Sequence, residues 1–279
     1  MNRDGQIEGM VNTIVCGDTL TILRSLPDNY VGVGVTSPPY NKMMGKNKGW
    51  LVGSVEYDTY TDYLPEEEYQ RNQIEVLNEL FRVTKEGGSF FYNHKVRWDK
   101  GKMIHPMEWL SKTDWAIRQE IVWDRGIAAN IRGWRFWQVE ERIYWLYKPV
   151  GKNLIGKELH SKDALMTSIW RIPPERNNRH PAPFPIELPL RCLLSVASPD
   201  DIVIDAYCGS GTTLVAAKKL GLRYLGIDIS NNYVEIAKKR ISDYASEENK
   251  MNTEIAKHTV LKTFKERKAR KNDDTTGYN

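Results

Sequence analysis

The segment from Ile202 to Thr213 constrains the fold of this chain more than any other. It reads as an apolar strand that ends in Asp205 and is followed by a tight turn through Gly209 and Gly211. A helix then begins at Thr212. Glycine lets the backbone turn sharply and approach a ligand closely, and a strand–turn–helix unit presents backbone N–H groups to a polar or anionic group. The pattern predicts an α/β protein with a small-molecule site at this turn.

The turn matches neither of the two common phosphate-binding motifs. A dinucleotide fingerprint needs a third glycine where this chain has Leu214, and the lysine of a phosphate-binding loop is absent as well. Downstream, the expected strand Arg223–Ile227 is followed by Asp228, whose carboxylate is well placed to accept hydrogen bonds from both hydroxyls of a ribose. A glycine turn accompanied by two strands that end in acids favours a nucleoside site over a purely structural turn.

A second candidate site follows the apolar strand Val31–Thr36, which runs directly into Ser37-Pro38-Pro39-Tyr40. Two consecutive prolines cannot continue a central strand, so the chain must leave the sheet at this point. The carbonyls of Ser37 and Pro38 then have no ladder to join, and Tyr40 supplies an aromatic ring. A rigid corner that is rich in acceptors and carries a ring suits a planar base whose amino group needs hydrogen-bond acceptors.

Short β-branched or aromatic runs alternate with longer helical patterns along the chain, which is typical of α/β sheet proteins. The expected strands are 13–16, 31–36, 89–93, 119–123, 142–147, 202–205 and 223–227. The expected helices are 19–25, 66–84, 106–112, 187–196, 212–220 and 232–244. A chain of 279 residues can bury one substantial core, so residues 1–245 are expected to form a single catalytic domain.

Three stretches, at about 41–63, 126–137 and 149–179, fit neither pattern and are expected to be loops that face DNA. The second of them interleaves aromatic and arginine side chains, which suits contact with a DNA backbone and unstacked bases, although the same aromatics could pack beneath the loop. The candidate DNA-binding residues are Lys42, Lys46, Lys48, Arg132 and Arg135.

Residues 246–279 are expected to form a charged C-terminal tail. Its basic cluster at 262–271 fits either a solvated end or an arm that contacts phosphates. The net charge of +4 does not by itself indicate a nucleic-acid partner. The three cysteines show no metal-binding spacing, and no long apolar run or leader is present, so a reduced cytoplasmic protein without metal or membrane is expected.

Taken together, the motifs resemble those of the amino-methylating DNA methyltransferases, which produce N4-methylcytosine or N6-methyladenine. The resemblance is carried by the segments 36–40 and 205–213, by 180–185 ahead of the glycine turn, and by 17–18 near the start. The catalytic segment precedes the cofactor segment, as in the circularly permuted β subgroup of restriction–modification systems. The resemblance covers about residues 12–243.

The resemblance implies a three-layer α/β/α Rossmann-like fold with a mostly parallel seven-stranded sheet, S-adenosylmethionine as the cofactor and double-stranded DNA as the partner. It implies that Asp205 lies near the methionine amino end of the cofactor, that Asp228 binds the ribose and that Asp18 binds the adenine. The full set of expected cofactor-binding residues is Asp18, Thr36, His180, Phe184, Asp205, Gly209, Gly211, Thr212 and Asp228. A buried loop histidine is the alternative interpretation of His180.

The expected catalytic residues are Ser37, Pro38, Pro39 and Tyr40. Within the family that the chain resembles, serine at position 37 is associated mainly with cytosine N4, whereas aspartate there is associated mainly with adenine N6. Cytosine is therefore the expected target, and adenine is the alternative. Cys208 lies in the cofactor turn rather than beside the catalytic segment, so a covalent attack on the ring, as in 5-methylcytosine formation, is not expected.

Two other classes of protein fit the sequence less well. RNA or protein methyltransferases usually place the glycine turn first in the chain. A DNA-binding module without catalytic activity would have no use for the cofactor turn. The resemblance also suggests a cognate restriction endonuclease that acts separately, and a monomer or homodimer as the assembly.

Overall fold

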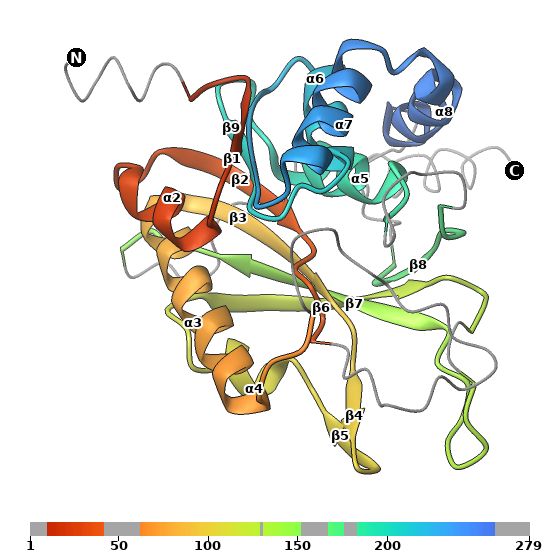
Figure 1. Cartoon of the computed structure of the whole chain (residues 1–279). Coiled ribbons are helices and arrows are strands. Elements are labelled where there is room, and N and C mark those ends of the chain that lie inside the picture. The colour runs from red at the N-terminus through yellow and green to blue at the C-terminus, as the bar shows by residue number, and fades with distance from the viewer. Residues whose placement is uncertain (1–9, 42–61, 129–130, 152–166, 176–182, 260–279) are drawn as a thin grey trace, which may run out of the picture.

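The computed structural model of the chain describes residues 10–41, 62–128, 131–151, 167–175 and 183–259. Its main sheet consists of β1 (Thr13–Cys16), β2 (Val31–Thr36), β3 (Thr84–His94), β6 (Ala116–Asp124), β7 (Glu140–Tyr147), β8 (Ile169–Arg171), β9 (Ile202–Asp205) and β10 (Arg223–Asp228). These strands lie in the order β1-β10-β9-β2-β3-β7-β6-β8 (Figure 1). A separate hairpin, β4 (Arg97–Asp99) and β5 (Lys102–Ile104), projects from the end of β3.

The sheet is mostly parallel, as expected. The five strands from β1 to β3 in this order run parallel to their neighbours, and β7 runs antiparallel to both β3 and β6. All seven expected strands are present. The eighth, β8, pairs in parallel with the end of β6 and comes from the stretch 149–179, which had been expected to be a loop throughout. This strand has three residues, of which only the central one, Trp170, is buried. Such a short pattern of buried and exposed residues cannot be recognised as periodic in the sequence.

Helices cover both faces of the sheet and make three layers (Figure 1). One face carries α2 (Thr19–Ser25), α3 (Glu66–Val83) and the short α4 (Met107–Leu110). The other carries α5 (Glu187–Val196), α6 (Thr212–Lys219), α7 (Asn231–Ser242) and, after the 3-10 turn η1 (Ala245–Glu247), α8 (Glu248–Thr259). This is the three-layer Rossmann-like arrangement that the family resemblance implies, with a sheet of eight strands instead of the expected seven.

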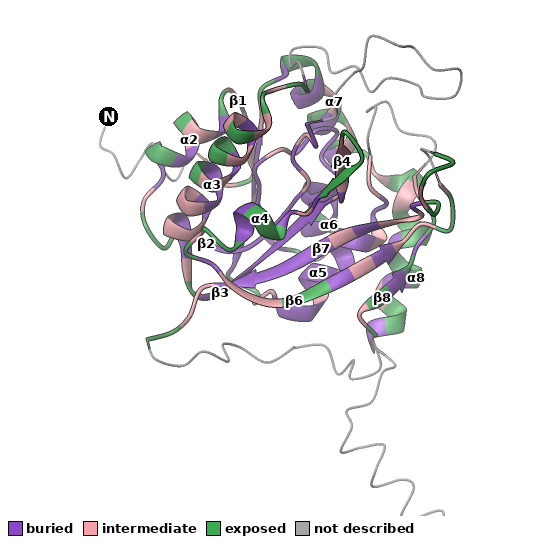
Figure 2. Ribbon diagram, turned by 90° about the horizontal axis from the view of Figure 1, so that it is seen from below, coloured by how far each residue is buried: buried purple, intermediate pink, exposed green. Residues whose placement is uncertain are grey.

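Two hydrophobic cores follow from the alternation of side chains along the strands. In β3, Phe90 and Tyr92 join the core beneath α2 and α3, whereas Phe91 joins the core beneath α5 and α6. In β9, Ile204 and Val203 divide in the same way. Both faces of these strands are therefore buried (Figure 2), which explains why the sequence shows short continuous apolar runs rather than an alternating pattern.

The region after residue 245 is not simply a tail, because it begins with the ordered helix α8. Met251, Glu254, Ile255 and His258 recur at helical spacing and form the side of α8 that packs on the domain. Glu254 is paired with Arg191 of α5 at 2.7 Å. The domain therefore extends to at least residue 259. The mixture of charged and apolar residues in this helix concealed its buried side in the sequence.

The strand order also fixes where a ligand can bind. The chain passes from β9 through α6 to β10 in one direction along the sheet, and from β2 through α3 to β3 in the other. The order reverses between β9 and β2, and in open α/β sheets ligands bind at such a point, beyond the carboxyl ends of the strands. Because β7 runs antiparallel to β3, the amino end of β7 lies beside the carboxyl ends of the parallel strands. In the described part of the chain, no helix is long and apolar enough to cross a membrane.

Candidate active site at the switch point of the sheet

A buried hydrogen bond joins the two halves of the chain at the switch point. Thr36 at the end of β2 donates its hydroxyl to Asp205 Oδ1 at the end of β9, at 2.7 Å. The carboxylate also accepts from the Thr213 hydroxyl and from the backbone N–H of Tyr207. Burial, opposed by these neutral donors, raises the pKa of Asp205 to about 6. The two predicted segments are thus brought into direct contact.

The glycine turn is held by the second predicted acid. Asp228 at the end of β10 accepts from the N–H of Gly209 at 2.8 Å and from the N–H of Ser230 at 2.9 Å. The Gly211 N–H is bonded to the carbonyl of Cys208. The expectation that this turn offers its N–H groups to a ligand is therefore wrong for Gly209 and Gly211. Asp228 is partly buried, and both of its carboxylate oxygens accept from the backbone of the turn and of the segment that follows β10.

Gly211 serves the packing of α6 against α7. Its φ of 79° lies in the left-handed region that favours glycine, and a Cβ at this position would approach the Cβ of Ala237 to 2.9 Å. The neighbouring Thr212 hydroxyl accepts a hydrogen bond from Arg240 of α7 at 2.8 Å and is buried. The Thr212 side chain, expected to contact the cofactor, is therefore engaged between the two helices.

The remaining expected cofactor residues are placed less centrally. Asp18 is exposed and caps α2, accepting from the Thr21 N–H at 2.8 Å. Phe184 is partly buried against the core that lies beneath α5 and α6. His180 lies outside the described residues.

The catalytic corner is fixed from one side by two aromatic residues. The Tyr69 hydroxyl donates to the carbonyl of Pro39 at 2.8 Å and lies 2.7 Å from His94 Nε2. The His94 ring lies 4.6 Å from the Tyr40 ring. Tyr69 and His94 are fully buried, so the corner has little freedom to move. Sequence reasoning missed both residues, because they come from α3 and from the end of β3.

From the other side, a polar network meets the corner at Tyr40. The Tyr40 hydroxyl donates to Glu141 Oε2 at 2.9 Å and lies 2.7 Å from Ser37 Oγ. Asn93 Nδ2 donates to the Tyr40 hydroxyl at 2.8 Å and to Glu141 at 3.1 Å. Arg125 pairs with the other oxygen of Glu141 at 3.1 Å. Sequence reasoning missed Asn93, Glu141 and Arg125.

One acceptor in this network lacks a partner in the described part of the chain. The side-chain oxygen of Asn93 is buried and has no hydrogen-bond partner among the residues that the structure describes. Buried polar atoms are nearly always paired, so this oxygen is an available acceptor for a donor from a ligand or from residues outside the described ranges.

Cys208 in the glycine turn is not equipped to act as a nucleophile. Burial raises the pKa of its thiol well above the ordinary value, and the nearby carboxylates of Asp205 and Asp228 raise it further. A thiolate is the reactive form of cysteine. These surroundings disfavour a nucleophilic role for Cys208.

The aromatic–arginine loop, residues 125–139 between β6 and β7, is irregular in its described part, as predicted. The Arg135 guanidinium lies 4.1 Å from the centre of the Trp98 ring in the β4–β5 hairpin, so loop and hairpin pack together. Arg132 is exposed, and Trp134, Phe136 and Trp137 expose 56%, 98% and 64% of their surface. The alternative interpretation, that these aromatics pack beneath the loop, is not supported by their exposure. Lys42, Lys46 and Lys48 lie outside the described residues.

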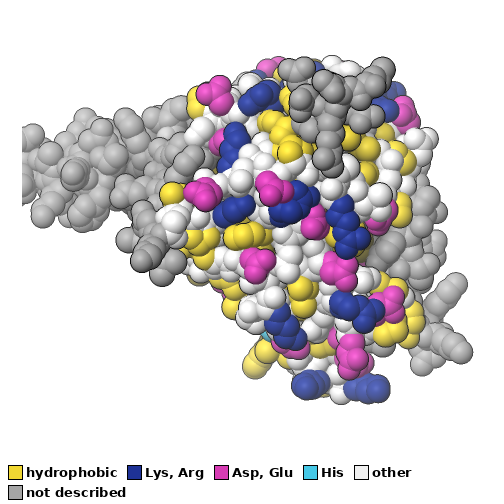
Figure 3. Space-filling view, turned by 90° about the vertical axis from the view of Figure 1, so that its left-hand side faces the viewer, with side chains coloured by type: hydrophobic (Ala, Val, Ile, Leu, Met, Phe, Trp, Pro, Cys, Tyr) yellow, Lys and Arg dark blue, Asp and Glu magenta, His cyan; other side chains and the backbone are white. Residues whose placement is uncertain are grey.

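The side of the molecule that carries α2 and α3 differs from this loop. Basic and acidic side chains are interspersed over it (Figure 3). Several of them form ion pairs, such as Arg24 with Glu75 and Arg82 with Asp28. A surface of alternating charge does not attract a polyanion, so this side is a poor candidate for DNA binding.

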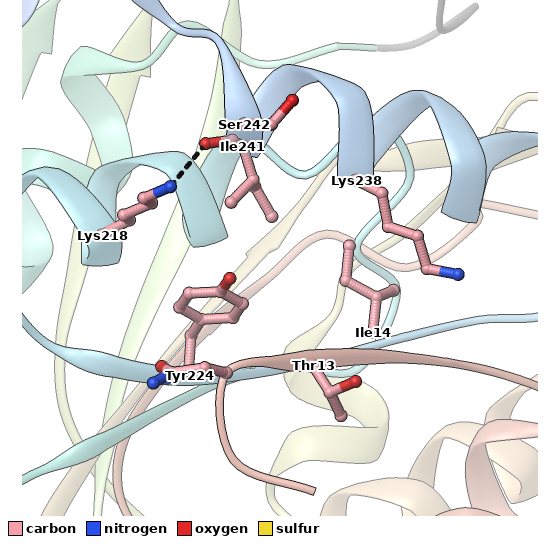
Figure 4. A pocket seen from close by; sticks show the side chains of 8 residues that line it. Thr13, Ile14, Lys218, Tyr224, Lys238, Ile241 and Ser242 are labelled. Carbon is pink, nitrogen blue, oxygen red and sulfur yellow. Dashed lines mark hydrogen bonds between the residues drawn. The ribbon is translucent and has the colours of Figure 1, made fainter.

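A pocket elsewhere on the protein is not the cofactor site. Figure 4 shows that it lies between the β1–β10 edge of the sheet and helices α6 and α7. Thr13 and Tyr224 line it from the amino ends of β1 and β10, whereas Asp205 and Asp228 lie at the carboxyl ends of their strands. Lys218 in this pocket donates to the carbonyl of Ile241 at 3.0 Å. Ligands of parallel sheets bind at the carboxyl ends.

The fold, with an acceptor-rich corner beside two acid-tipped strands at its switch point, defines a Rossmann-like methyltransferase. Comparison of sequences identifies the family. The profile of a DNA methylase family, named for N6 and N4 methyltransferases, matches residues 31–239. The chain therefore belongs to the amino-methylating DNA methylases, and its methyl donor is S-adenosylmethionine.

The curated relatives are of the restriction–modification type. The chain is 30% identical over 273 residues to the type II methyltransferase M.BglII of Bacillus subtilis, covering 86% of this chain and 71% of that protein. It is 26% identical over 261 residues to the type II methyltransferase M.HinfI of Haemophilus influenzae, covering 85% and 70%.

Similar solved structures agree with this assignment of the family and the fold. TTHA0409 of Thermus thermophilus, a proposed DNA modification methylase in complex with S-adenosylmethionine, is 27% identical, with a TM-score of 0.61 over 83% of this chain and 93% of that one. The cytosine-N4-specific PvuII DNA methyltransferase is 18% identical, with a TM-score of 0.65 over 90% of this chain and 93% of that one, which supports the fold alone.

The buried carboxyl of Asp205 makes a prediction about stability. Its pKa is about 6 in the folded protein against an ordinary value of 3.8, so the folded state binds more protons than the unfolded state between these values. Ionisation of Asp205 therefore lowers the free energy of unfolding as the pH rises from about 4 to 7, by up to about 3 kcal/mol. The side chain of Asp205→Asn does not ionise, so the free energy of unfolding of this variant lacks this decrease.

The measurement is urea unfolding of both proteins across that pH range. The free energy of unfolding of Asp205→Asn minus that of the wild type should increase with pH. A difference that is constant or that decreases would contradict the assignment of a raised pKa.

Proposed function

We propose that the chain transfers the methyl group of S-adenosylmethionine to the exocyclic N4 of cytosine in double-stranded DNA, after the base has been flipped out of the helix. The observation that carries the proposal is the Thr36–Asp205 hydrogen bond, because it sets the acceptor corner that begins at Ser37 directly beside the cofactor half. Adenine N6 on the same scaffold is the alternative.

The cofactor half suits this donor. Asp205 is a buried carboxylate whose hydrogen-bond donors, Thr36, Thr213 and the Tyr207 N–H, are all neutral, and this favours a cationic ligand group such as the ammonium of the methionine portion. Asp228, partly buried at the end of β10 beside the glycine turn, suits a ribose diol because each carboxylate oxygen can accept a further hydrogen bond.

The other residues proposed to contact the cofactor act around these two acids. Asp18, exposed at the start of α2, would accept from the adenine amino group. Phe184 and His180 would close over the methionine portion. Gly209 and Gly211 act by shaping the turn beneath the cofactor, and Thr212 by its place at the first turn of α6.

The reaction needs acceptors because the amine of cytosine or adenine is a poor nucleophile, its lone pair being delocalised into the ring. The Ser37 hydroxyl and the Pro38 carbonyl accept from the amine, which favours a pyramidal nitrogen and stabilises the positive charge that develops on it. Pro39 stiffens the corner, and its carbonyl is held by Tyr69. The sulfonium of the cofactor supplies an activated methyl group, and alignment of the amine with it contributes through positioning.

The target atom is poorly accessible inside a duplex, so the base must leave the stack. We assign stacking on the flipped base to Tyr40, whose ring already lies against His94. Serine at position 37 favours cytosine over adenine, as in the N4-methylating enzymes that the motif resembles. We propose a separately acting restriction endonuclease as the functional partner, in keeping with the similarity to type II methyltransferases.

Identification of the methylated nucleoside tests the proposal. The protein is incubated with labelled S-adenosylmethionine and, in parallel, DNA, RNA or protein. Label is expected in DNA alone, and digestion of that DNA is expected to release N4-methylcytosine. N6-methyladenine would establish the alternative, whereas 5-methylcytosine, or label only in RNA or protein, would contradict the proposed chemistry.

The DNA cleft is proposed to lie between the loop at 126–137 and the segment that follows the catalytic corner. Arg132 is exposed on the first loop, whereas Arg135 is partly committed to Trp98. Lys42, Lys46 and Lys48 are proposed to neutralise phosphates from the second segment. The exposed aromatics beside Arg132 suit unstacked bases.

Arg132→Ala should weaken DNA binding for all sequences and make the slope of log affinity against log salt shallower by about one unit. The matched control is Arg24→Ala, an arginine on the side with interspersed charges, 60% exposed and paired with Glu75. A salt titration of binding compares the three proteins. If the slope changed for Arg24→Ala and not for Arg132→Ala, the DNA would have been placed on the wrong side.

A further inference from the structure

We propose that Glu141 is a positioning residue of the catalytic corner that directs the hydrogen bonds of Tyr40 and Ser37 and finally takes up the proton released by methyl transfer. The inference rests on the proposed function. Its basis is the chain of hydrogen bonds from Ser37 Oγ to the Tyr40 hydroxyl, at 2.7 Å, and from there to Glu141 Oε2, at 2.9 Å.

The carboxylate fixes the direction of this chain. Glu141 pairs with Arg125, and a carboxylate can only accept hydrogen bonds, so the single hydroxyl proton of Tyr40 points to Glu141. The Tyr40 oxygen must then accept from the Ser37 hydroxyl. With its own proton committed to Tyr40, Ser37 Oγ faces an incoming amine as an acceptor. The role that the reaction requires of Ser37 is therefore set by a residue 104 positions away in the sequence.

Asn93 holds the same geometry from β3. Its side-chain nitrogen donates to the Tyr40 hydroxyl at 2.8 Å and to Glu141 Oε2 at 3.1 Å, with a longer contact of 3.3 Å to Ser37 Oγ. A donor shared among the three oxygens holds them together without supplying a proton acceptor. Only Glu141 in this network gains a proton without becoming a cation.

The proton balance of the step is complete. The amine nitrogen forms a bond to the methyl carbon while the carbon–sulfur bond breaks and its electron pair stays on sulfur. The amine then carries one proton too many. That proton passes to Ser37 Oγ as the Ser37 proton passes to Tyr40 and the Tyr40 proton passes to Glu141. Serine and tyrosine end as they began, and Glu141 ends as the neutral acid, which returns its proton to water after the product leaves.

Glu141 lies at the amino end of β7, which is why it reaches a site otherwise built from the carboxyl ends of parallel strands. The titratable groups that face its carboxylate are Arg125, beyond β6, and Tyr40 of the catalytic corner. His94 of β3 contacts the far side of this arrangement, through the Tyr40 ring. Glu141 is buried, so a network that served stability alone would gain little from a charge here.

The test uses Glu141→Gln, which keeps the shape and removes the capacity to take a proton. Methyl transfer to DNA is measured in a single turnover with the cofactor bound at saturation. The rate constant is expected to fall about 100-fold or more, the range of acid–base contributions, with the dissociation constants for cofactor and DNA unchanged within about threefold. The matched control is Glu140→Gln, the adjacent acid of β7, which lies outside this network and should retain the wild-type rate.

Tyr40→Phe interrupts the chain at its middle and keeps the ring. Tyr40→Phe should lower the rate constant of methyl transfer to a similar extent. The double variant Tyr40→Phe/Glu141→Gln should be no slower than the slower of the two single variants, because the effects of residues that act in series on the rate are not additive. Tyr40→Ala, which also loses the ring, should be slower than Tyr40→Phe.

A conservative variant separates proton uptake from a structural role. Glu141→Asp keeps a carboxylate and should retain more of the wild-type rate than Glu141→Gln, which keeps the length of the side chain but cannot take up a proton. A rate for Glu141→Gln within about threefold of the wild type, or a Glu141→Asp variant that is slower than Glu141→Gln, overturns the inference. If Glu141→Gln does not fold, the rate constant of Tyr40→Phe provides the test, and a value within about threefold of the wild type overturns the inference. A wild-type protein that methylates no DNA would refute the proposed function instead.

Discussion

The hydrogen bond between Thr36 and Asp205 is the interaction on which the site depends. It spans the switch point of the sheet, where the strand that leads to the catalytic corner lies beside the strand that leads to the glycine turn. Because each partner is the last residue of its strand and both are buried, the two segments cannot shift independently. A methyl donor held by one half and an amine held by the other would therefore meet in a fixed geometry, as positioning catalysis requires.

Each half is in turn held by residues from outside its motif. The glycine turn is tied to β10 by Asp228 and to α7 by Arg240, so its backbone groups are largely satisfied within the protein. The catalytic corner is held by Tyr69 on one side and by Glu141 on the other, through Pro39 and Tyr40. The short motifs thus owe their shape to long-range contacts, which hold the acceptors in place before a substrate arrives.

This division explains how much could be predicted from the sequence. The short apolar strands, the glycine turn and the double proline have local causes, so the strands and the two candidate segments could be predicted from the sequence, and the family resemblance supplied the three-layer arrangement. The hydrogen bond that joins the two segments was not predicted. Asn93, Glu141, Arg125 and Tyr69 act through partners that are distant in the sequence, and nothing local distinguishes them from ordinary polar residues. Glu141 had one signal in the sequence, since it is an acid immediately before the expected strand 142–147, and in the structure it is the second residue of β7.

The same reasoning accounts for the elements that were missed. Strand β8 has three residues and owes its existence to the free edge of β6, and helix α8 hides its buried side among charges that pair with α5. The glycine turn shows the reverse error, since its N–H groups were expected to face a ligand and two of them instead bond within the protein. The tight turn itself was predicted correctly, whereas the hydrogen-bond partners of its N–H groups were not.

The most direct test is a crystal structure of the protein with an unreactive S-adenosylmethionine analogue and a DNA duplex that the protein methylates. We expect one base outside the helical stack, its amino nitrogen within hydrogen-bond distance of Ser37 Oγ and the Pro38 carbonyl, and the analogue's ammonium at Asp205. An analogue bound elsewhere, such as in the pocket beside Lys218, or a duplex with every base stacked, would contradict the proposed site.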